Sequence, residues 1–256
     1  MLLAVDIGNT NIVIGIYEGI TLKTHWRLSS VITRTSDECW ILLNMLLNES
    51  NIHFSKIDGA IISSVVPNIT PAFFRMFKRK LKIDAIIVDA DLDIGLKILY
   101  HDPKAVGADR IVNAVAGYFL LGGPLILVDF GTATTFDVVS EKCEYLGGII
   151  TLGVESSASI LHRFAARLPK VEMKFPDELI GRTTETSIQS GLMFGTVELI
   201  DGMITRIQQE LGKPAKTVAT GGLANLIIPY SKTISRIEPF LTLEGLRLIY
   251  EKITQV

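Results

Sequence analysis

The sequence contains little cysteine, no large excess of either charge and no long uninterrupted hydrophobic run. Its 256 residues include two cysteines, Cys39 and Cys143, with neither a metal-ligand spacing nor a disulfide framework, so both are expected to be reduced thiols. The formal net charge is −2 and the Lys and Arg residues are scattered, so we expect no nucleic-acid-binding surface. The longest uncharged apolar stretch, 111–128, is cut by Gly122-Gly123-Pro124, which favours a helix and then a buried strand over a membrane span.

The amino terminus also lacks the features of a secretory signal. The apolar residues 1–5 reach Asp6 too early, and no basic segment precedes them. We therefore expect a cytoplasmic protein that contacts no membrane. The mean hydropathy of +0.38 is nevertheless high, which is typical of sheets whose strands are buried on both faces, or of a sizeable subunit interface.

One pattern occurs twice in the chain. Residues 2–10 read LLAVDIGNT and residues 125–134 read LILVDFGTAT: in both, an apolar run ends in Asp, a Gly follows two positions later, and hydroxyl or amide side chains come next. Each copy precedes a second expected strand, over 11–17 and 135–139. The duplication predicts an α/β protein with two domains of similar fold, 1–115 and 116–256, and the last helix is expected to pack back on the first domain.

The other segments alternate between helical and extended patterns. Apolar residues at helical spacing predict helices, and short apolar runs predict buried strands. A turn is expected at Gly147-Gly148. The predicted helices cover 36–48, with Ser36 as N-cap, 70–81, 105–121, 155–167, 187–211 and 243–253, and the predicted strands cover 59–66, 85–88 and 217–220.

The two repeated turns have the composition of phosphate-binding loops. Glycine lets the backbone approach a ligand closely, so that several N–H groups of a tight turn can point into one concavity. Asn and Thr add donors for phosphate oxygens, and an Asp at the strand end can hold the water shell of Mg²⁺. The patterns GxxxxGK[ST] and GxGxxG are absent. The alternative is a plain hairpin turn, but the duplication, together with Gly221-Gly222 after a third strand, favours phosphate binding.

One acidic residue lies where a helix is expected to begin. Asp109 follows Gly107-Ala108 and precedes Arg110. An anion is favoured at a helix amino terminus, and a neighbouring Arg stabilises its charged form, so we expect an ionised carboxylate that can accept a proton from an alcohol. On these residues alone, a structural pair of Asp109 with Arg110 is the simpler interpretation.

Four stretches together resemble a known family. Residues 6–11 (DIGNTN), 107–114 (GADRIVNA), 181–191 (GRTTETSIQSG) and 241–246 (LTLEGL) are similar to motifs of the type III pantothenate kinases, members of the actin-like ATPase, sugar kinase and Hsp70 superfamily. The resemblance implies two actin-like (ribonuclease H-like) domains around a nucleotide cleft. It also implies ATP-dependent phosphorylation of pantothenate to 4′-phosphopantothenate, the first step of coenzyme A biosynthesis, by a homodimer.

The resemblance implies roles for individual residues. Asp109 would be the proton acceptor of an in-line phosphoryl transfer. A monovalent cation, K⁺ or NH₄⁺, would lie at Asp129, and Asp6 would hold Mg²⁺ through water. The residues expected to bind ATP are Asp6, Ile7, Gly8, Asn9, Thr10, Asn11, Ile12, Val13, Thr132, Gly221 and Gly222, and those expected to bind pantothenate are Tyr100, Gly107, Ala108, Asp109, Arg110 and Thr184.

Two positions depart from the family pattern. Leu152 precedes Gly153 where the family usually has Pro, and Thr183 stands where Asn is common, which leaves the loop geometry of the second domain open. Two other functions also stay open: another small-molecule kinase or polyphosphate phosphatase of the superfamily, and a non-catalytic nucleotide-binding regulator. The Gly-Ala-Asp-Arg motif favours the pantothenate kinase interpretation.

Overall fold

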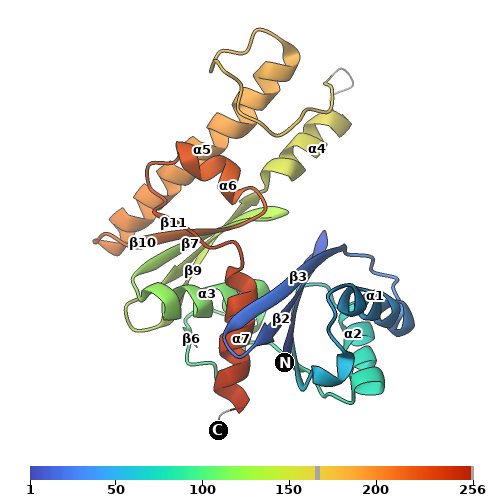
Figure 1. The fold of residues 1–256 in the computed structure, drawn as a ribbon. Helices are drawn as coiled ribbons and strands as arrows, with labels where there is room; N and C mark the ends of the chain where they lie inside the picture. The colour runs from blue at the N-terminus through green and yellow to red at the C-terminus, as the bar shows by residue number, and fades with distance from the viewer. Residues whose placement is uncertain (165–167, 255–256) are drawn as a thin grey trace. The chain divides into compact units, whose positions relative to one another are not determined.

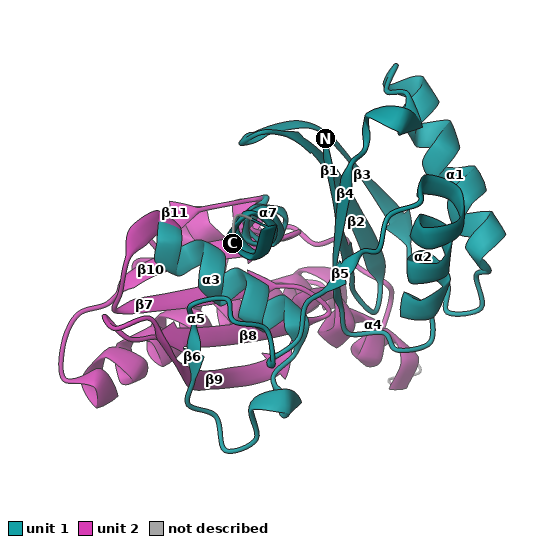
Figure 2. Cartoon of the chain, turned by 90° about the horizontal axis from the view of Figure 1, so that it is seen from below, with its two compact units in different colours: residues 1–119, 240–256 teal, residues 120–239 magenta. Residues whose placement is uncertain are grey.

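A computed structural model describes residues 1–164 and 168–254 of the chain (Figure 1). The chain divides into two compact units, which Figure 2 shows in different colours. Unit 1 consists of residues 1–119 and 240–256, and unit 2 of residues 120–239. The first boundary lies at residues 119 and 120, near the end of helix α3 (Ala108–Leu121), and the carboxy-terminal segment groups with unit 1.

Unit 1 is built on a five-stranded mixed sheet with the order β3-β2-β1-β4-β5. Strand β1 (Leu2–Ile7) pairs antiparallel with β2 (Asn11–Glu18), which pairs antiparallel with β3 (Thr21–Ser29). On its other side β1 pairs in parallel with β4 (Gly59–Ser64), and β4 pairs in parallel with β5 (Ile86–Ile87). The central strands β1 and β4 are almost continuously apolar and buried, as expected for a sheet that is covered on both faces.

Helices cover both faces of this sheet. Helices α1 (Ser36–Glu49) and α2 (Thr70–Met76) pack on one face and form a common core with alternate strand residues. Helix α7 (Leu241–Thr254) contacts β1, β2 and β4 on the other face. The alternation of β2 shows the two sides, because Ile14 points into the α1–α2 core whereas the next residue, Gly15, lies against Leu243 of α7.

Unit 2 repeats the strand order of unit 1. The meander β7-β8-β9 is antiparallel, and β10 and β11 follow in parallel on the other side of β7. Counted from its first strand, each unit therefore has neighbouring strands in the order 3-2-1-4-5, which confirms the predicted duplication of an α/β fold. The strands are β7 (Leu125–Phe130), β8 (Ala133–Val139), β9 (Glu144–Leu152), β10 (Lys216–Gly221) and β11 (Arg236–Ile237).

The long helix α5 (Thr184–Leu211) covers one face of the unit 2 sheet. Its buried residues recur every three or four positions, so that they form one stripe against the inward side chains of β7, β8 and β10. Gly212, with φ 67°, ends the helix in the left-handed conformation that favours glycine. Helices α4 (Val154–Phe164) and α6 (Ala224–Ile227) pack beside it. The stripe consists of Met193, Val197, Ile200, Ile204 and Ile207.

Several predicted elements differ from the structure. The turn expected at Gly147-Gly148 was wrong, since both glycines lie inside β9 opposite Val138 and Asp137. Gly147 has a φ of 128° and lies beside a register shift in the β8–β9 pair. A glycine at this position therefore allows an irregularity within the strand and does not form a turn. The sequence also gave no prediction for β3 or β9. Strand β3 alternates exposed and half-buried residues, as a strand at the edge of a sheet does.

The predicted helices need smaller corrections. The helix expected over 105–121 begins at Ala108, and α1 is capped by Thr35 and not by Ser36. The Thr35 hydroxyl accepts a hydrogen bond from Glu38 N–H, while the Glu38 carboxylate accepts one from Thr35 N–H at 2.7 Å. Of the helix expected over 155–167, the last three residues lie outside the described part of the chain. The short elements are β6 (Lys97–Ile98), a π turn (Phe77–Leu81) after α2, and 3₁₀ turns at Phe54–Lys56, Pro103–Ala105 and Ile228–Tyr230.

Across the two described ranges, no helix has both the length and the hydropathy to cross a membrane.

Candidate functional site

The first repeated turn joins β1 and β2 in unit 1. Gly8 N–H donates a hydrogen bond to the Asn11 carbonyl at 2.9 Å and closes the turn. The Thr10 carbonyl accepts one from Ser30 N–H at 2.9 Å, so the loop after β3 is tied to the turn. The side chains of Asn9 and Thr10 are exposed. Backbone contacts therefore hold the turn in shape while its polar side chains stay accessible to a ligand.

This turn lies at the carboxyl edge of two parallel strands. Asp6 of β1 is opposite Ser63 of β4, and Val65 N–H donates a hydrogen bond to the Ile7 carbonyl at 3.1 Å. A Cβ on Gly107 would lie 3.5 Å from Cγ1 of Val65, so the segment before α3 reaches the same edge. Ligands of open α/β sheets bind outside the carboxyl ends of the strands. Unit 1 thus brings the turn and the start of α3 to one edge of its sheet.

Asp109 lies partly buried in the first turn of α3. Its Oδ1 accepts a hydrogen bond from Arg110 N–H at 2.8 Å, and a Cβ on Gly107 would come within 2.5 Å of the same oxygen. Burial raises the pKa of Asp109, and the hydrogen bond and charge of Arg110, which lower this pKa, do not compensate. The sequence reasoning included Arg110, which lowers this pKa, but not the burial that outweighs it, and the expected ionised carboxylate stays a prediction.

Some residues expected to bind ATP offer no side chain to a ligand. Ile7 and Ile12 are each 0% exposed and belong to the core between the sheet and helices α1 and α2. A nucleotide could meet only their backbone groups. The side chain of Val13 is partly buried on β2. The turn therefore presents Asn9 and Thr10 as its exposed side chains, with the half-buried Asp6 behind them.

The second repeated turn joins β7 and β8 in unit 2. Gly131 N–H donates a hydrogen bond to the Ala133 carbonyl at 3.1 Å. The Thr132 carbonyl accepts two hydrogen bonds, from Gly153 N–H at 3.1 Å and from the Ser156 hydroxyl at 2.7 Å. In both units the residue after the third strand is thus tied to the turn. Sequence patterns assigned neither Gly153 nor Ser156 to this turn, because β9, which brings them next to it, was not predicted.

The Gly-Gly pair begins at the last residue of β10. Gly221 has a φ of 94° and lies opposite Phe130 of β7. A Cβ on Gly221 would lie 2.6 Å from Oδ1 of Asp129 and 2.6 Å from the Phe130 nitrogen. The contacts of the protein itself therefore require glycine here, beside the Asp of the second turn. A Gly221→Val variant would disturb the sheet and cannot serve as a specific probe of nucleotide contact. Gly222 is exposed.

Comparison with known proteins adds the family. The family model described as "Type III pantothenate kinase" matches residues 2–206. The chain belongs to the type III pantothenate kinase family. A type III pantothenate kinase from Moorella thermoacetica is 47% identical over 254 residues, which cover 99% of this chain and 100% of the relative. Another, from Geobacillus kaustophilus, is 46% identical over 255 residues, with coverage of 100% and 99%.

Solved structures share the fold of this type III pantothenate kinase family member. The activator of the 2-hydroxyisocaproyl-CoA dehydratase from Clostridium difficile has a TM-score of 0.56 at 12% identity, covering 100% of this chain and 97% of that one. A ROK hexokinase from Thermus thermophilus has a TM-score of 0.51 at 13% identity, covering 100% of both chains. At these identities the likeness concerns the fold alone. It confirms the predicted α/β fold with two mixed sheets.

The other positions that match type III pantothenate kinase motifs differ in exposure. Tyr100 is 39% exposed, and Thr184 is the exposed first residue of α5. Ala108 and Arg110 are buried in the first turn of α3. Thr183, which departs from the usual Asn, is the N-cap of α5 and accepts a hydrogen bond from Thr186 N–H at 3.1 Å. Since Asn and Thr both cap helices in this way, the departure preserves the local structure. Leu152 is the half-exposed last residue of β9.

Asp6 and Asp129, which the type III pantothenate kinase motifs associate with cations, both lie opposite hydroxyl-bearing residues on neighbouring strands. Asp6 is opposite Ser63, and Asp129 is opposite Thr135 on one side and Thr220 on the other. In the part of the chain that the structure describes, no three His, Cys, Asp or Glu side chains gather into a metal cluster. A single carboxylate with oxygen neighbours suits Mg²⁺, which keeps several waters and substrate oxygens, better than Zn²⁺, which prefers nitrogen and sulfur.

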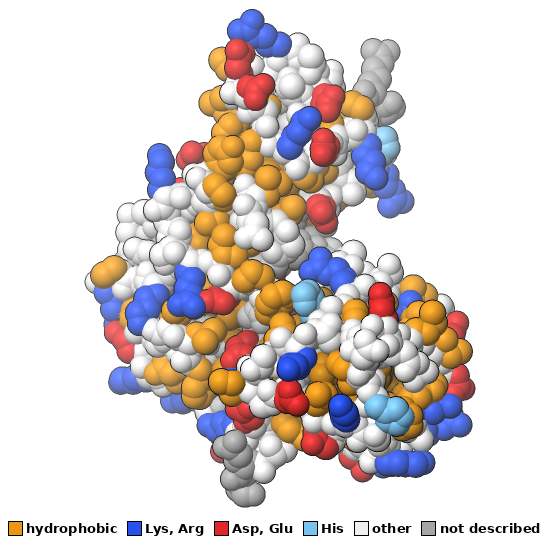
Figure 3. All heavy atoms as spheres, in the orientation of Figure 1, with side chains coloured by type: hydrophobic (Ala, Val, Ile, Leu, Met, Phe, Trp, Pro, Cys, Tyr) orange, Lys and Arg blue, Asp and Glu red, His pale blue; other side chains and the backbone are white. Residues whose placement is uncertain are grey.

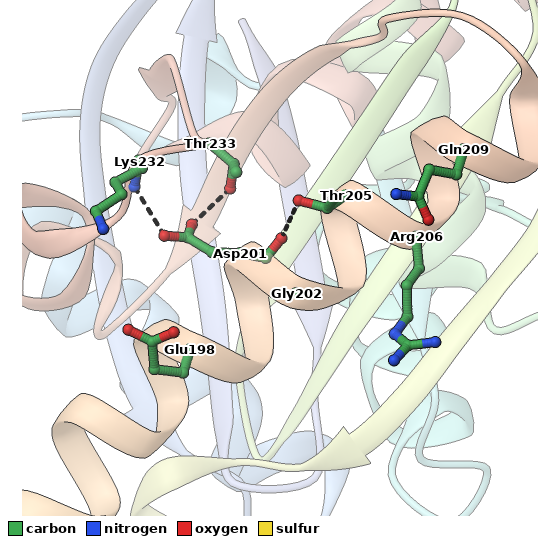
Figure 4. A pocket seen from close by; sticks show the side chains of 8 residues that line it. All are labelled: Glu198, Asp201, Gly202, Thr205, Arg206, Gln209, Lys232 and Thr233. Atoms are coloured by element: carbon green, nitrogen blue, oxygen red, sulfur yellow. Dashed lines mark hydrogen bonds between the residues drawn. The ribbon is translucent and has the colours of Figure 1, made fainter.

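Unit 2 also has a surface hollow of about 590 Å³ beside α5 (Figure 4). In it the Asp201 carboxylate accepts hydrogen bonds from Lys232 N–H at 2.9 Å and from the Thr233 hydroxyl at 2.6 Å. Burial would raise the pKa of Asp201, but these hydrogen bonds and one from Ser231 outweigh it and lower that pKa. The group ties a loop to α5, and none of the motif residues lines the hollow. Its lining residues are Glu198, Asp201, Gly202, Thr205, Arg206, Gln209, Lys232 and Thr233.

Proposed function

We propose that this chain transfers a phosphoryl group from ATP to pantothenate, forming 4′-phosphopantothenate in the first step of coenzyme A biosynthesis. The observation that carries the proposal is the 47% identity to a type III pantothenate kinase across 99% of the chain. The common edge of unit 1 that holds the β1–β2 turn and Asp109 supports it, since phosphoryl transfer needs a phosphate site and a base near the acceptor.

In this proposal the two repeated turns bind the nucleotide. The backbone N–H groups around Gly8, with the side chains of Asn9 and Thr10, contact phosphate oxygens. Ile7, Ile12 and Val13 act through their backbone, because the two isoleucines are fully buried. The remaining ATP contacts of the proposal are Asp6, Asn11, Thr132, Gly221 and Gly222.

Asp109 serves as the proton acceptor for the primary alcohol. Its burial moves the pKa upward from the ordinary range of Asp, and a general base works best when its pKa is nearer the working pH. The Arg110 N–H holds Oδ1, which leaves Oδ2 for the substrate hydroxyl. A positioned base of this kind contributes about 10² to 10⁴ in rate.

Pantothenate itself carries a carboxylate, an amide and two hydroxyls. Tyr100 and Thr184 are exposed residues, and in the proposal their hydroxyl groups supply hydrogen bonds to these groups. Gly107 has no side chain to clash with Asp109 Oδ1, and it adds backbone contacts to pantothenate in the proposal. Ala108 and Arg110, both buried at the start of α3, complete the proposed pantothenate contacts.

Two cations complete the proposal. Asp6 would hold Mg²⁺ through water, and Asp129 would hold K⁺ or NH₄⁺, each beside hydroxyl-bearing residues that suit hard cations. When bound, these cations offset the negative charge of the phosphates. Activity assays in buffers with Na⁺ as the only monovalent cation test the second site, and full activity there excludes it.

A homodimer is part of the proposal as well. Unit 2 exposes large apolar side chains next to α5, with Leu179 at 64% and Ile180 at 80% exposure, and Figure 3 shows hydrophobic side chains along this part of the unit. Exposed apolar patches mark association surfaces. Light scattering of the purified protein measures the mass directly. An Ile180→Asp variant that keeps the mass of the parent argues against this surface as the contact.

The decisive experiment is a coupled ADP-release assay with pantothenate and a panel of sugars. We expect ADP release with pantothenate only. Asp109→Asn should bind both substrates nearly as well as the parent but lose turnover by about 10² to 10⁴. Turnover of a sugar instead of pantothenate would assign the chain to a different kinase, and near-full turnover of the variant would remove Asp109 from its role.

A further inference from the structure

A short loop of unit 1 carries two polar groups that are buried without a hydrogen-bond partner. The loop, residues 30–34, follows β3 and leads to Thr35, the N-cap of α1. Ser30 Oγ and Arg34 Nη1 are both buried, and within the described part of the chain neither has a hydrogen-bond partner. Such groups are uncommon in native proteins, because a buried donor without a partner loses its bonds to water and gains none in return.

This loop lies next to the turn that we assign to the nucleotide phosphates. The strand pairing places Ser29 opposite Asn11, and Ser30 N–H donates a hydrogen bond to the Thr10 carbonyl at 2.9 Å. Arg34 N–H closes the loop on the Val31 carbonyl at 3.1 Å. Thus the backbone fixes both ends of the segment, one of them directly against the turn.

The carboxylates nearest to Arg34 in the sequence are already engaged elsewhere. Asp37 forms an ion pair with Lys80 at 3.4 Å, and the Glu38 carboxylate accepts hydrogen bonds from the N–H and the hydroxyl of Thr35 at 2.7 and 2.9 Å. Among residues 1–164 and 168–254, Arg34 is in no ion pair. The hydrogen bonds from Thr35 and, as a smaller contribution, the positive charge of Arg34 lower the pKa of Glu38, while burial raises the pKa of Cys39 and the Arg34 charge opposes that rise. The guanidinium therefore lies near the amino end of α1.

A guanidinium is suited to an oxyanion, because its planar N–H groups match the geometry of phosphate and carboxylate oxygens. A Ser hydroxyl adds one more donor, and the amino end of a helix favours negative charge. From the two partnerless groups and the tie to Thr10, we infer that Ser30 and Arg34 form an oxyanion-binding subsite for a bound reactant. The oxyanion is a phosphate of ATP or the carboxylate of pantothenate. The inference rests on the proposed function for the identity of these reactants.

The test compares Arg34→Gln with Arg75→Gln. Arg75 is an exposed residue of α2 in the same unit, it also forms no ion pair within the described ranges, and its replacement changes the net charge equally. For each variant the KM values for ATP and for pantothenate are measured by ADP release, together with thermal unfolding with and without each ligand. Arg34→Lys tests rescue, because Lys keeps the charge but not the planar donor pair.

We expect Arg34→Gln to raise the KM of one reactant by about 10- to 100-fold, to remove most of the unfolding shift that this reactant causes, and to leave the ligand-free unfolding temperature unchanged. The reactant affected identifies the oxyanion. Arg34→Lys should recover part of the loss and Ser30→Ala should show a smaller loss of the same kind.

Two results would overturn the subsite. One is an Arg34→Gln variant that matches Arg75→Gln for both reactants. The other is a fall of several degrees in its ligand-free unfolding temperature, which would mean that Arg34 has a structural partner. If the parent protein does not turn over pantothenate at all, the proposed function fails, and ligand-induced unfolding shifts with ATP still test Arg34.

Discussion

Because α7 and α3 cross closely in unit 1, we can predict whether replacing a glycine at the crossing stabilises or destabilises the protein. Gly245 of α7 lies against Val112 of α3: a Cβ on Gly245 would lie 2.6 Å from Cγ1 of Val112 and still closer to its carbonyl oxygen. In an exposed helix, Gly→Ala is favourable by about 0.8–1 kcal/mol. Here the added methyl meets backbone that a rotamer change cannot move, and overpacking costs about 1–3 kcal/mol. Once the gain is subtracted from the cost, Gly245→Ala should destabilise unit 1 by up to about 2 kcal/mol.

Gly202→Ala is the matched control. Gly202 also lies in a helix, α5, but a Cβ there would have no neighbour within 4 Å. The same chemical change should therefore stabilise the protein by up to about 1 kcal/mol. Urea unfolding at constant m-value, followed by circular dichroism, measures both variants against the parent. If Gly245→Ala is as stabilising as Gly202→Ala, the helices do not cross as closely as described and the reasoning from the Val112 contact fails.

The crossing also bears on the proposed active site. Val112 follows Asp109 by three residues, so both lie on the same side of α3, and Asn113, one residue further, accepts a hydrogen bond from the Thr242 hydroxyl at 2.8 Å. Helix α7 therefore supports the face of α3 that carries the proposed base. We expect Gly245→Ala to lower turnover more than Gly202→Ala does.

Three further predictions concern pH and the second unit. Burial raises the pKa of Asp109, so the folded protein binds the proton of this group more tightly than the unfolded chain does; the resulting stabilisation is present below the unfolded pKa and is lost as the pH rises through the folded pKa. Asp109→Asn should therefore unfold at a higher temperature than the parent at pH 8, and the difference should vanish near pH 3. A difference that is the same at both pH values contradicts the burial. The pKa of Asp201 is lowered, so the stabilisation that this carboxylate contributes is present above the unfolded pKa and is lost as the pH falls. Asp201→Ala should destabilise the protein by about 1–3 kcal/mol at pH 7 and by less near pH 2, as measured by urea unfolding. An equal loss at both pH values refutes the assigned hydrogen bonds. Gly221→Ala should destabilise unit 2 even without nucleotide, because residue 221 has a positive φ and an added Cβ would clash with Asp129. A ligand-free unfolding curve identical to that of the parent would show that the site has room for a side chain.

The sequence by itself determined the duplication and much of the secondary structure. Residues 2–7 and 125–130 are apolar runs that end in Asp, and such runs have few alternatives to buried central strands. The helical spacing of apolar residues likewise predicted α1, α5 and α7, with boundaries that differ by a few residues. The proposed site residues came from family motifs, in which Gly, Asp and Thr at fixed spacing form a recognisable pattern.

Other features were decided only by the tertiary structure. The edge strand β3 has no continuous apolar run, and Gly147-Gly148 has the composition of a turn. Both segments are extended because they pair with a neighbouring strand, which the local sequence does not reveal. The direction of the pKa shift of Asp109 depends on burial in the folded protein, which outweighs the effect of its sequence neighbour Arg110. The need for glycine at position 221 comes from Asp129 and Phe130, which are far away in the sequence. In each case the deciding interaction is between residues that only the fold brings together.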